Sequence, residues 1–195
     1  WLAGELGGCF SYFVKLIERK GMLYIHFGIP CETWSILTCI NGGSRRLEQP
    51  YGGARGIDRS KKEEVANEQL FSMMRLIRAI SKVGGYWSVE NPQSSFLWAT
   101  AELTELAKDN FTVVFDQCMY MLRPPDFYAG GKSQDIRTRK STTLVTNIAN
   151  LSKLAVRCDG QHDHITALGS CRLEGKTIKR SKFAGRYPKA LCRRW

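Results

Sequence analysis

A long amphipathic segment between two short apolar segments most constrains the fold of this chain. Residues 22–27 and 86–90 lack polar alternation and contain bulky side chains, as is typical of strands covered on both faces. Between them, residues 63–83 carry apolar side chains at the three- and four-residue spacing of a helix, with charges between them: Leu70, Met73, Met74, Ile77 and Ile80. The pattern predicts two neighbouring strands of an α/β sheet joined through a helix.

The remaining segments extend this α/β pattern. Helices are expected at 9–19 and 99–108, with a short one at 151–156, and further strands at 111–115 and 141–146, which would form a final hairpin. At 195 residues the chain is long enough for one domain with an appendage. We expect an α/β domain over residues 1–157 and a basic Cys- and His-containing segment over 158–195.

The charge of the chain favours an anionic partner, above all nucleic acid. Lys and Arg outnumber Asp and Glu by 29 to 18, a formal charge of +11. Nine basic residues and one acid lie between 172 and 195, and residues 41–62 form a glycine-rich loop with six basic residues. A solvated basic tail is the alternative. The candidate phosphate contacts are Arg45, Arg46, Arg55, Arg137, Arg139, Lys179, Arg180 and Lys182.

Composition and cysteine usage suggest an intracellular protein. No apolar run approaches the roughly 18 residues that a membrane span needs, so no membrane partner is expected. No signal peptide is visible, and the absence of an initiator Met suggests an excised piece. Seven cysteines without a dense, even framework indicate a reducing compartment, which includes the nucleus. Protein partners are not indicated.

Two predicted strands end in residues that can do chemistry. Pro30 and Cys31 follow the first strand, and Glu90 and Asn91 end the second. Because ligands sit beyond the carboxyl ends of strands in such sheets, a thiol and a carboxyl would meet in one crevice. A thiolate can add to an electron-poor ring carbon while a carboxyl shares a proton with the ring nitrogen. Alternatively, Cys31 is a small buried side chain and Glu90 braces a loop.

The sequences around these strand ends resemble a known family. The segments IPCETWS (29–35) and VENPQSSFLW (89–98) are similar to the Pro-Cys and Glu-Asn motifs of DNA cytosine-5 methyltransferases, and closer to the methyltransferase-like domains of eukaryotic retroelements. The resemblance covers residues from about 22 to the end. Four further motifs follow in the same order: FDQC (115–118), RTRKSTTL (137–144), CDGQHDH (158–164) and YPKALC (187–192).

The resemblance implies roles for individual residues. Cys31 matches the nucleophile that attacks the cytosine ring and Glu90 the carboxyl that engages the ring nitrogen, and Ser35 and Asn91 in the same motifs are expected to contact the substrate. Arg137 and Arg139 match basic residues near the target base and backbone, and residues 41–62 match the position of a mobile catalytic loop that carries Arg45, Arg46 and Arg55. Enzymes of this kind act on a base taken out of the stack.

The resemblance also implies S-adenosylmethionine as cofactor, but its binding half is not visible in this sequence. The glycines at 4, 7 and 8 follow no predicted strand, so the chain matches only the second half of a Rossmann-like methyltransferase sheet. Two functions therefore stay open: a cytosine methyltransferase-like enzyme, or a nucleic-acid-binding module without catalysis.

A Cys/His cluster predicts a metal site in the C-terminal segment. Cys158, His162, His164 and Cys171 offer two thiolates and two imidazoles at short spacing, the ligand types of a tetrahedral zinc site. The spacing matches no common zinc finger, and surface histidines with unrelated cysteines are the alternative.

Overall fold

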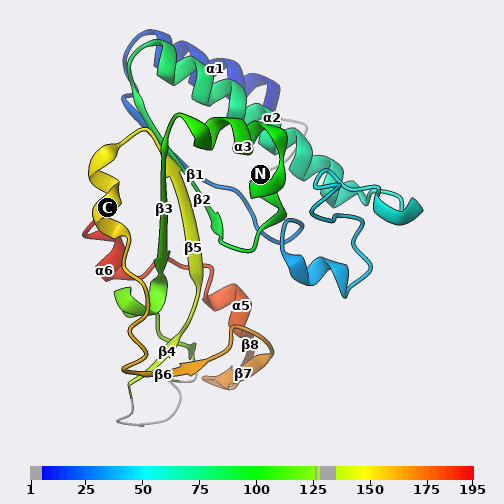
Figure 1. Ribbon diagram of the computed structural model, residues 1–195, viewed down its shortest axis with the longest axis vertical. Helices are drawn as coiled ribbons and strands as arrows, with labels where there is room; N and C mark the ends of the chain where they lie inside the picture. The colour runs from blue at the N-terminus through cyan, green and yellow to red at the C-terminus, as the bar shows by residue number, and fades with distance from the viewer. Residues whose placement is uncertain (1–5, 126, 128–134) are drawn as a thin grey trace. The chain divides into compact units, whose positions relative to one another are not determined.

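The computed structural model describes residues 6–125, 127 and 135–195, and side chains from residue 10 onward (Figure 1). The chain is a mixed α/β structure that divides into two compact units. Unit 1 comprises the described residues up to Thr112 together with Leu144–Ala149, and unit 2 comprises Val113–Thr143 and Asn150–Trp195. The predicted boundary after residue 157 falls inside unit 2. No helix of the described residues is long and apolar enough to cross a bilayer.

Four strands form the main sheet, in the order β1-β2-β5-β3. They are β1 (Tyr24–Gly28), β2 (Tyr86–Pro92), β3 (Phe111–Asp116) and β5 (Ser141–Thr146). The first two are parallel and pair from Tyr24 with Tyr86 to Gly28 with Glu90. All four predicted strands are therefore confirmed, and the last two are neighbours, as the predicted hairpin requires.

Helix α2 (Lys61–Lys82) contributes more buried side chains to the core of unit 1 than any other element described. Ser60 and Glu63 form a capping box at its start, and Gly84, at a φ of +76°, follows its end. Its apolar stripe is buried with Trp87 and Val89 of β2, which explains why the periodicity predicts this helix well. Helix α1 (Leu6–Glu18) runs beside α2 (Figure 1), and α3 (Ala101–Lys108) precedes β3. Short 3₁₀ helices span Ile36–Cys39, Ala54–Gly56 and Phe96–Ala99.

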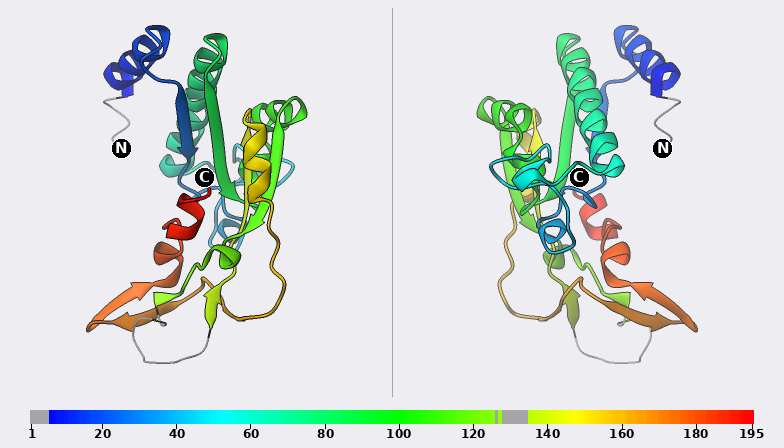
Figure 2. Two further views of the ribbon diagram at one scale, coloured as in Figure 1. Left: turned by 90° about the vertical axis from the view of Figure 1, so that its left-hand side faces the viewer. Right: turned by 90° about the vertical axis from the view of Figure 1, so that its right-hand side faces the viewer.

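Unit 2 contains short strands that the sequence does not predict. Strand β4 (Ile136–Thr138) pairs in parallel with β6 (Asp163–Ile165), and β7 (Ser170–Leu173) pairs antiparallel with β8 (Lys176–Lys179). In Figure 2 this second, orange pair leads into α5 (Arg180–Phe183) and α6 (Lys189–Cys192). The described residues of this region also include two 3₁₀ helices, η4 (Gln117–Tyr120) and η5 (Ala149–Leu154), the second near the short helix expected at 151–156.

The core of unit 2 is small, and its buried tyrosine is hydrogen-bonded. Phe115, Leu154 and Leu191 are completely buried, and Tyr120 stacks edge-on against Phe115. The Tyr120 hydroxyl donates a hydrogen bond of 2.8 Å to the carbonyl oxygen of Leu154. Burial of the ring therefore leaves no unpaired hydroxyl.

Candidate functional site: paired strand ends and a Cys/His cluster

The two predicted catalytic residues lie at the same edge of the sheet in unit 1. Gly28, three residues before Cys31, is the register partner of Glu90. The Asn91 side chain donates a hydrogen bond of 2.9 Å from Nδ2 to the carbonyl oxygen of Ile29, which ties the two strand ends together. Glu90 and Asn91 are buried, whereas Cys31 is half-buried. The parallel pairing thus brings the Pro-Cys and Glu-Asn segments to one place.

The turn after Cys31 is fixed to the segment that follows Glu90. Trp34 is completely buried, and its carbonyl oxygen accepts hydrogen bonds from the Phe96 backbone N–H at 2.8 Å and from the Ser95 hydroxyl at 3.4 Å. Ser35, predicted to contact substrate, instead accepts a hydrogen bond from Leu37 N–H at the start of a 3₁₀ helix. Its hydroxyl therefore has a structural partner.

Three buried polar atoms at this edge have no hydrogen-bond partner within the described part of the chain. They are Oδ1 of Asn91, Oγ1 of Thr33 and Nε1 of Trp34. Since buried polar groups are almost always satisfied by protein, water or ligand, such atoms are candidates for contact with a bound polar group. In Asn91, the side-chain nitrogen already donates to the Ile29 carbonyl oxygen, so the oxygen is the atom of this amide that remains for a bound group.

Arg45 corrects one prediction, because it is a structural residue and not a phosphate contact. The side chain is completely buried, and its guanidinium lies 3.6 Å from the centre of the Trp34 ring. It donates hydrogen bonds to the carbonyl oxygens of Pro50 and Glu63 and to Oδ1 of Asn67. Burial lowers the pKa of Arg45 to about 10, partly offset by the charge of Glu63. A guanidinium enclosed in this way cannot reach nucleic acid.

Glu63 is a second anchor of the glycine-rich loop. Its carboxylate accepts hydrogen bonds from the backbone N–H and hydroxyl of Ser44, both at 3.0 Å, and from the N–H and hydroxyl of Ser60, at 2.8 and 3.0 Å. Burial alone would raise the pKa of this carboxyl, but these donors keep it below its ordinary value. The loop expected to be mobile is thus fastened to α2 at Ser44 and Arg45.

The other two loop arginines differ in accessibility. Arg46 is half-buried and donates to the carbonyl oxygens of Gly43 and Arg45. Arg55 is exposed and has a left-handed backbone, with φ at +57°. Of the three arginines predicted to contact phosphate in this loop, Arg55 is the exposed one, so it is the best placed to meet an external anion.

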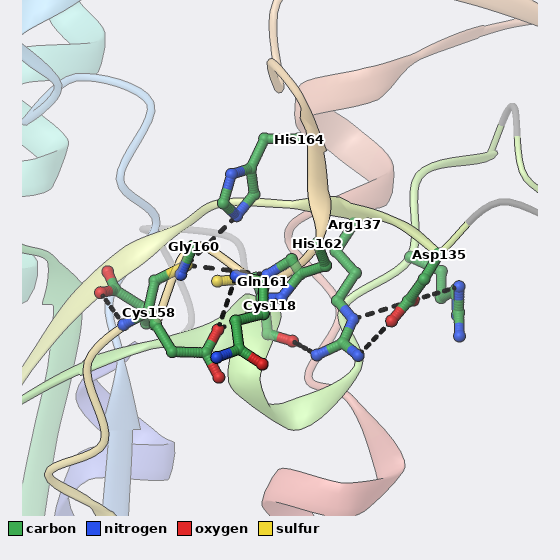
Figure 3. A network of polar contacts seen from close by, with 11 residues as sticks. Cys118, Asp135, Arg137, Cys158, Gly160, Gln161, His162 and His164 are labelled. Carbon is green, nitrogen blue, oxygen red and sulfur yellow. Dashed lines mark hydrogen bonds and ion pairs between the residues drawn. The ribbon is translucent and has the colours of Figure 1, made fainter.

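A Cys/His cluster in unit 2 could hold a metal ion. The ligand atoms of Cys118, Cys158, His162 and His164 all lie within 4.8 Å of one another. Sγ of Cys158 is 3.7 Å from Nε2 of His162 and 3.5 Å from Nε2 of His164 (Figure 3). Bond lengths of about 2.3 Å for Zn–S and about 2.05 Å for Zn–N place neighbouring S and N vertices of a tetrahedron roughly 3.5 Å apart. Both measured separations fit this geometry.

The fourth member of this cluster differs from the prediction. Cys171 lies in β7 opposite Ile178 and is not among the four clustered ligands, whereas Cys118 takes that place. Cys118 follows β3 and precedes Cys158 by forty residues, so local spacing could not reveal it. Its occurrence in the FDQC motif was the available signal. The cluster therefore joins residues from both sides of the predicted domain boundary.

Surrounding groups hold the cluster in place. Gly160 N–H points to Sγ of Cys158 at 3.4 Å, and Nδ1 of His162 is 3.7 Å from Oδ1 of Asp159. The buried Asp116 accepts a hydrogen bond of 2.9 Å from Cys158 N–H and another from the Ser141 hydroxyl. Although burial opposes it, these bonds and the charge of Arg157 keep the pKa of Asp116 below its ordinary value. Such outer contacts are typical of metal sites.

The Cys118 thiol must lose its proton to bind a cation. Burial, together with the neighbouring Cys158, raises the pKa of the Cys118 thiol to about 12. Without a cation, the Cys118 thiol is therefore protonated at neutral pH. Because metal binding replaces thiol protons, binding of Zn²⁺ at this cluster should release protons and weaken as pH falls.

The remaining basic candidates lie in unit 2. Arg137 is mostly buried and pairs with Asp135, whereas the side chain of Arg139 is 55% exposed and lies 4.0 Å from Asp116. Lys179 and Lys182 are exposed, and Arg180 donates a hydrogen bond of 3.2 Å to the carbonyl oxygen of Leu168. The exposed cations among these candidates are therefore Arg139 and the two lysines, whereas Arg137 is covered by its ion pair with Asp135.

Comparison with known proteins adds no family assignment. No protein-family model matches the chain, and a search of curated proteins gives no match.

Proposed function

We propose that this chain is a methyltransferase-like domain that engages a cytosine of nucleic acid through Cys31 and Glu90. The observation that carries the proposal is the register of β1 and β2, which pairs Gly28 with Glu90 and so puts the Pro-Cys turn beside the Glu-Asn segment. The net charge of +11 supports a polyanionic partner. The choice of cytosine as the target nucleobase rests on the resemblance to the motifs of DNA cytosine-5 methyltransferases.

The chemistry requires a thiolate and a proton donor on one ring. The Cys31 thiolate adds to C6 of the cytosine, and the π electrons of the C5–C6 bond shift to C5 and, by conjugation, to the ring nitrogen N3. The Glu90 carboxyl shares a proton with the ring nitrogen and thereby stabilises the added charge. C5 then takes a proton from water, and the reverse elimination removes one of the two C5 hydrogens and releases the thiolate. The net result is exchange of the C5 hydrogen with solvent.

The described residues do not fit S-adenosylmethionine. Of the glycines at 4, 7 and 8, Gly7 and Gly8 belong to helix α1 and Gly4 lies outside the described residues; within the described residues no strand precedes β1. We therefore assign no cofactor residues and route no step through a methyl donor. The exchange reaction needs none.

Release of tritium from DNA labelled at cytosine C5 tests the proposal directly. The wild-type protein should release tritium to water, and Cys31→Ser and Glu90→Gln should each lower the rate at least about 100-fold, as expected for loss of a nucleophile or an acid. Cys39→Ser is the matched control, since Cys39 is another half-buried thiol, and its Sγ donates a hydrogen bond to the Arg45 carbonyl oxygen. Equal release by wild type and Cys31→Ser would refute the catalytic role.

A binding module without chemistry is the second candidate. It is favoured by the exposed cations Arg55, Arg139, Lys179 and Lys182, together with the lack of a fitting cofactor site among the described residues. It predicts salt-dependent DNA or RNA binding that Cys31→Ser leaves unchanged, with no tritium release by the wild type. The same two measurements thus separate the two functions.

A further inference from the structure

Two arginines of unit 2 converge on one carboxylate. Nη1 of Arg123 is 2.8 Å from Oδ1 of Asp135, and Arg137 pairs with both carboxylate oxygens (Figure 3). The arginine side chains are only 18% and 15% exposed, whereas that of Asp135 is 44% exposed. The carboxylate is thus the accessible member of the group. We call the side chains of Arg123 and Arg137 the arginine fork.

The two guanidiniums of the arginine fork carry more positive charge than the single carboxylate of Asp135 neutralises. Within the described residues, Asp135 is the one carboxylate in an ion pair with either guanidinium, and Asp159 attracts Arg137 from a greater distance while facing His162. The Arg123 guanidinium also lies 4.2 Å from the centre of the Phe127 ring, which keeps it in place. Two fixed guanidiniums sharing one exposed carboxylate form a site that a phosphate, with more acceptor oxygens, can occupy.

The arginine fork is directly connected to the Cys/His cluster. Nη1 of Arg137 donates a hydrogen bond of 3.1 Å to the carbonyl oxygen of Cys118, a member of the cluster. Arg137 is also the register partner of His164 in the β4–β6 pair. Cys118 therefore holds the guanidinium of Arg137, and His164 lies beside its backbone. Because both residues are clustered metal ligands, ordering of the cluster fixes the position of Arg137.

We propose that the arginine fork binds a backbone phosphate of nucleic acid in place of Asp135, and that it does so only when a metal ion fills the Cys/His cluster. The proposal rests on the nucleic-acid partner of the proposed function but not on its chemistry at Cys31. In the absence of nucleic acid, Asp135 occupies the site as an internal anion and covers the two guanidiniums. A phosphate then replaces it. The contribution of the fork to nucleic-acid binding thus becomes dependent on metal.

Fluorescence anisotropy with a labelled DNA duplex, measured over a series of NaCl concentrations on zinc-loaded protein, tests this proposal. Arg123→Gln should weaken binding about tenfold and lower the salt slope by about one, as expected for one lost phosphate contact. Arg123→Lys keeps the charge but loses the fork geometry and should recover only part of the affinity. Lys153→Gln, which removes one exposed positive charge of η5, is the control for net charge.

Replacement of Asp135 separates this proposal from a purely structural ion pair. Asp135→Asn should strengthen binding several-fold, because the competing carboxylate is gone, and should do so more than Asp109→Asn, which removes an exposed acid elsewhere. A structural ion pair predicts weaker binding and lower stability instead. Zinc content measured for each variant verifies that the cluster remains loaded.

Removal of the metal provides the second test. In protein depleted with a chelator, wild type and Arg123→Gln should bind with equal affinity. The proposal is overturned if Arg123→Gln behaves like Lys153→Gln, if Asp135→Asn weakens binding, or if the effect of Arg123→Gln persists without metal. If the fork variants behave as expected while tritium release is absent, the chemistry fails and the fork stands. Absence of any DNA binding refutes both.

Discussion

Replacing Glu63 with glutamine should loosen the glycine-rich loop and destabilise unit 1 by about 4 kcal/mol. In the wild type, Oε2 accepts three hydrogen bonds and Oε1 accepts one, from Ser44 N–H. With the amide oxygen in place of Oε2, three charge-assisted bonds become neutral and lose about 1 kcal/mol each. The amide NH₂ then faces the Ser44 N–H, which leaves a buried donor unsatisfied at a cost of about 1 kcal/mol.

The same substitution should change the response to acid. The folded-state pKa of Glu63 lies below its ordinary value, so the unfolded chain binds the proton more readily. The stability that this carboxylate contributes is fully present above the ordinary pKa of about 4.3 and is lost as pH falls toward the folded-state value. The difference in unfolding free energy between wild type and Glu63→Gln should therefore shrink below about pH 4.3.

Urea denaturation between pH 7 and pH 3 measures both effects, and hydrogen exchange of residues 41–62 locates the loosening. Glu64→Gln is the matched control, because Glu64 is the exposed acid next to Glu63 in the same helical turn. That variant should stay within about 0.5 kcal/mol of wild type. If Glu63→Gln is as stable as Glu64→Gln, or if its deficit does not depend on pH, the proposed anchoring role is refuted.

Three further outcomes test other parts of the structure. Cys118→Ser should lower zinc stoichiometry toward zero and raise hydrogen exchange in β4 and β6, as treatment with a chelator should. Cys171→Ser should keep the metal. The opposite result for the two variants would restore the ligand set predicted from the sequence. Burial lowers the pKa of His26 to about 4, so wild type should lose stability as pH falls from about 6.5 to about 4, and His26→Asn should lack this loss in a thermal melt over the same range. Arg45→Lys should destabilise by about 2–3 kcal/mol in urea, through lost hydrogen bonds and ring contact, yet leave the salt slope of DNA binding unchanged, since a lower slope would mean that Arg45 reaches phosphate.

Periodic apolar segments made the main elements predictable. The stripe of α2 and the apolar character of β1 and β2 come from burial against the core, and burial leaves a direct mark on the sequence. The parallel pairing of β1 with β2 then follows from a single intervening helix. Consequently the position of Cys31 and Glu90 at one sheet edge could be predicted from the order of the elements alone.

Features that depend on contacts between distant residues could not be predicted. Strands β6, β7 and β8 have three or four residues each and few buried side chains, so they carry no periodic signal. Arg45 lies in a basic, glycine-rich segment that suggested exposure, but Trp34 and Asn67 provide the partners that make its burial possible. Cys118 joins the Cys/His cluster only because the fold returns the chain to the end of β3.

The composition of unit 1 has a consequence for folding during synthesis. Its last segment, Leu144–Ala149, follows more than thirty residues of unit 2 in the sequence. The Thr146 hydroxyl donates a hydrogen bond to the Trp87 carbonyl oxygen, and Asn147 bonds both Trp87 N–H and the Gly85 carbonyl oxygen. These backbone groups of residues 85 and 87 therefore lack their hydrogen-bond partners until the ribosome has added about sixty further residues. Such long-range pairing slows folding. A ribosome-bound chain that stops at residue 112 should remain incompletely folded, and an expression boundary at this point would remove partners that β2 requires.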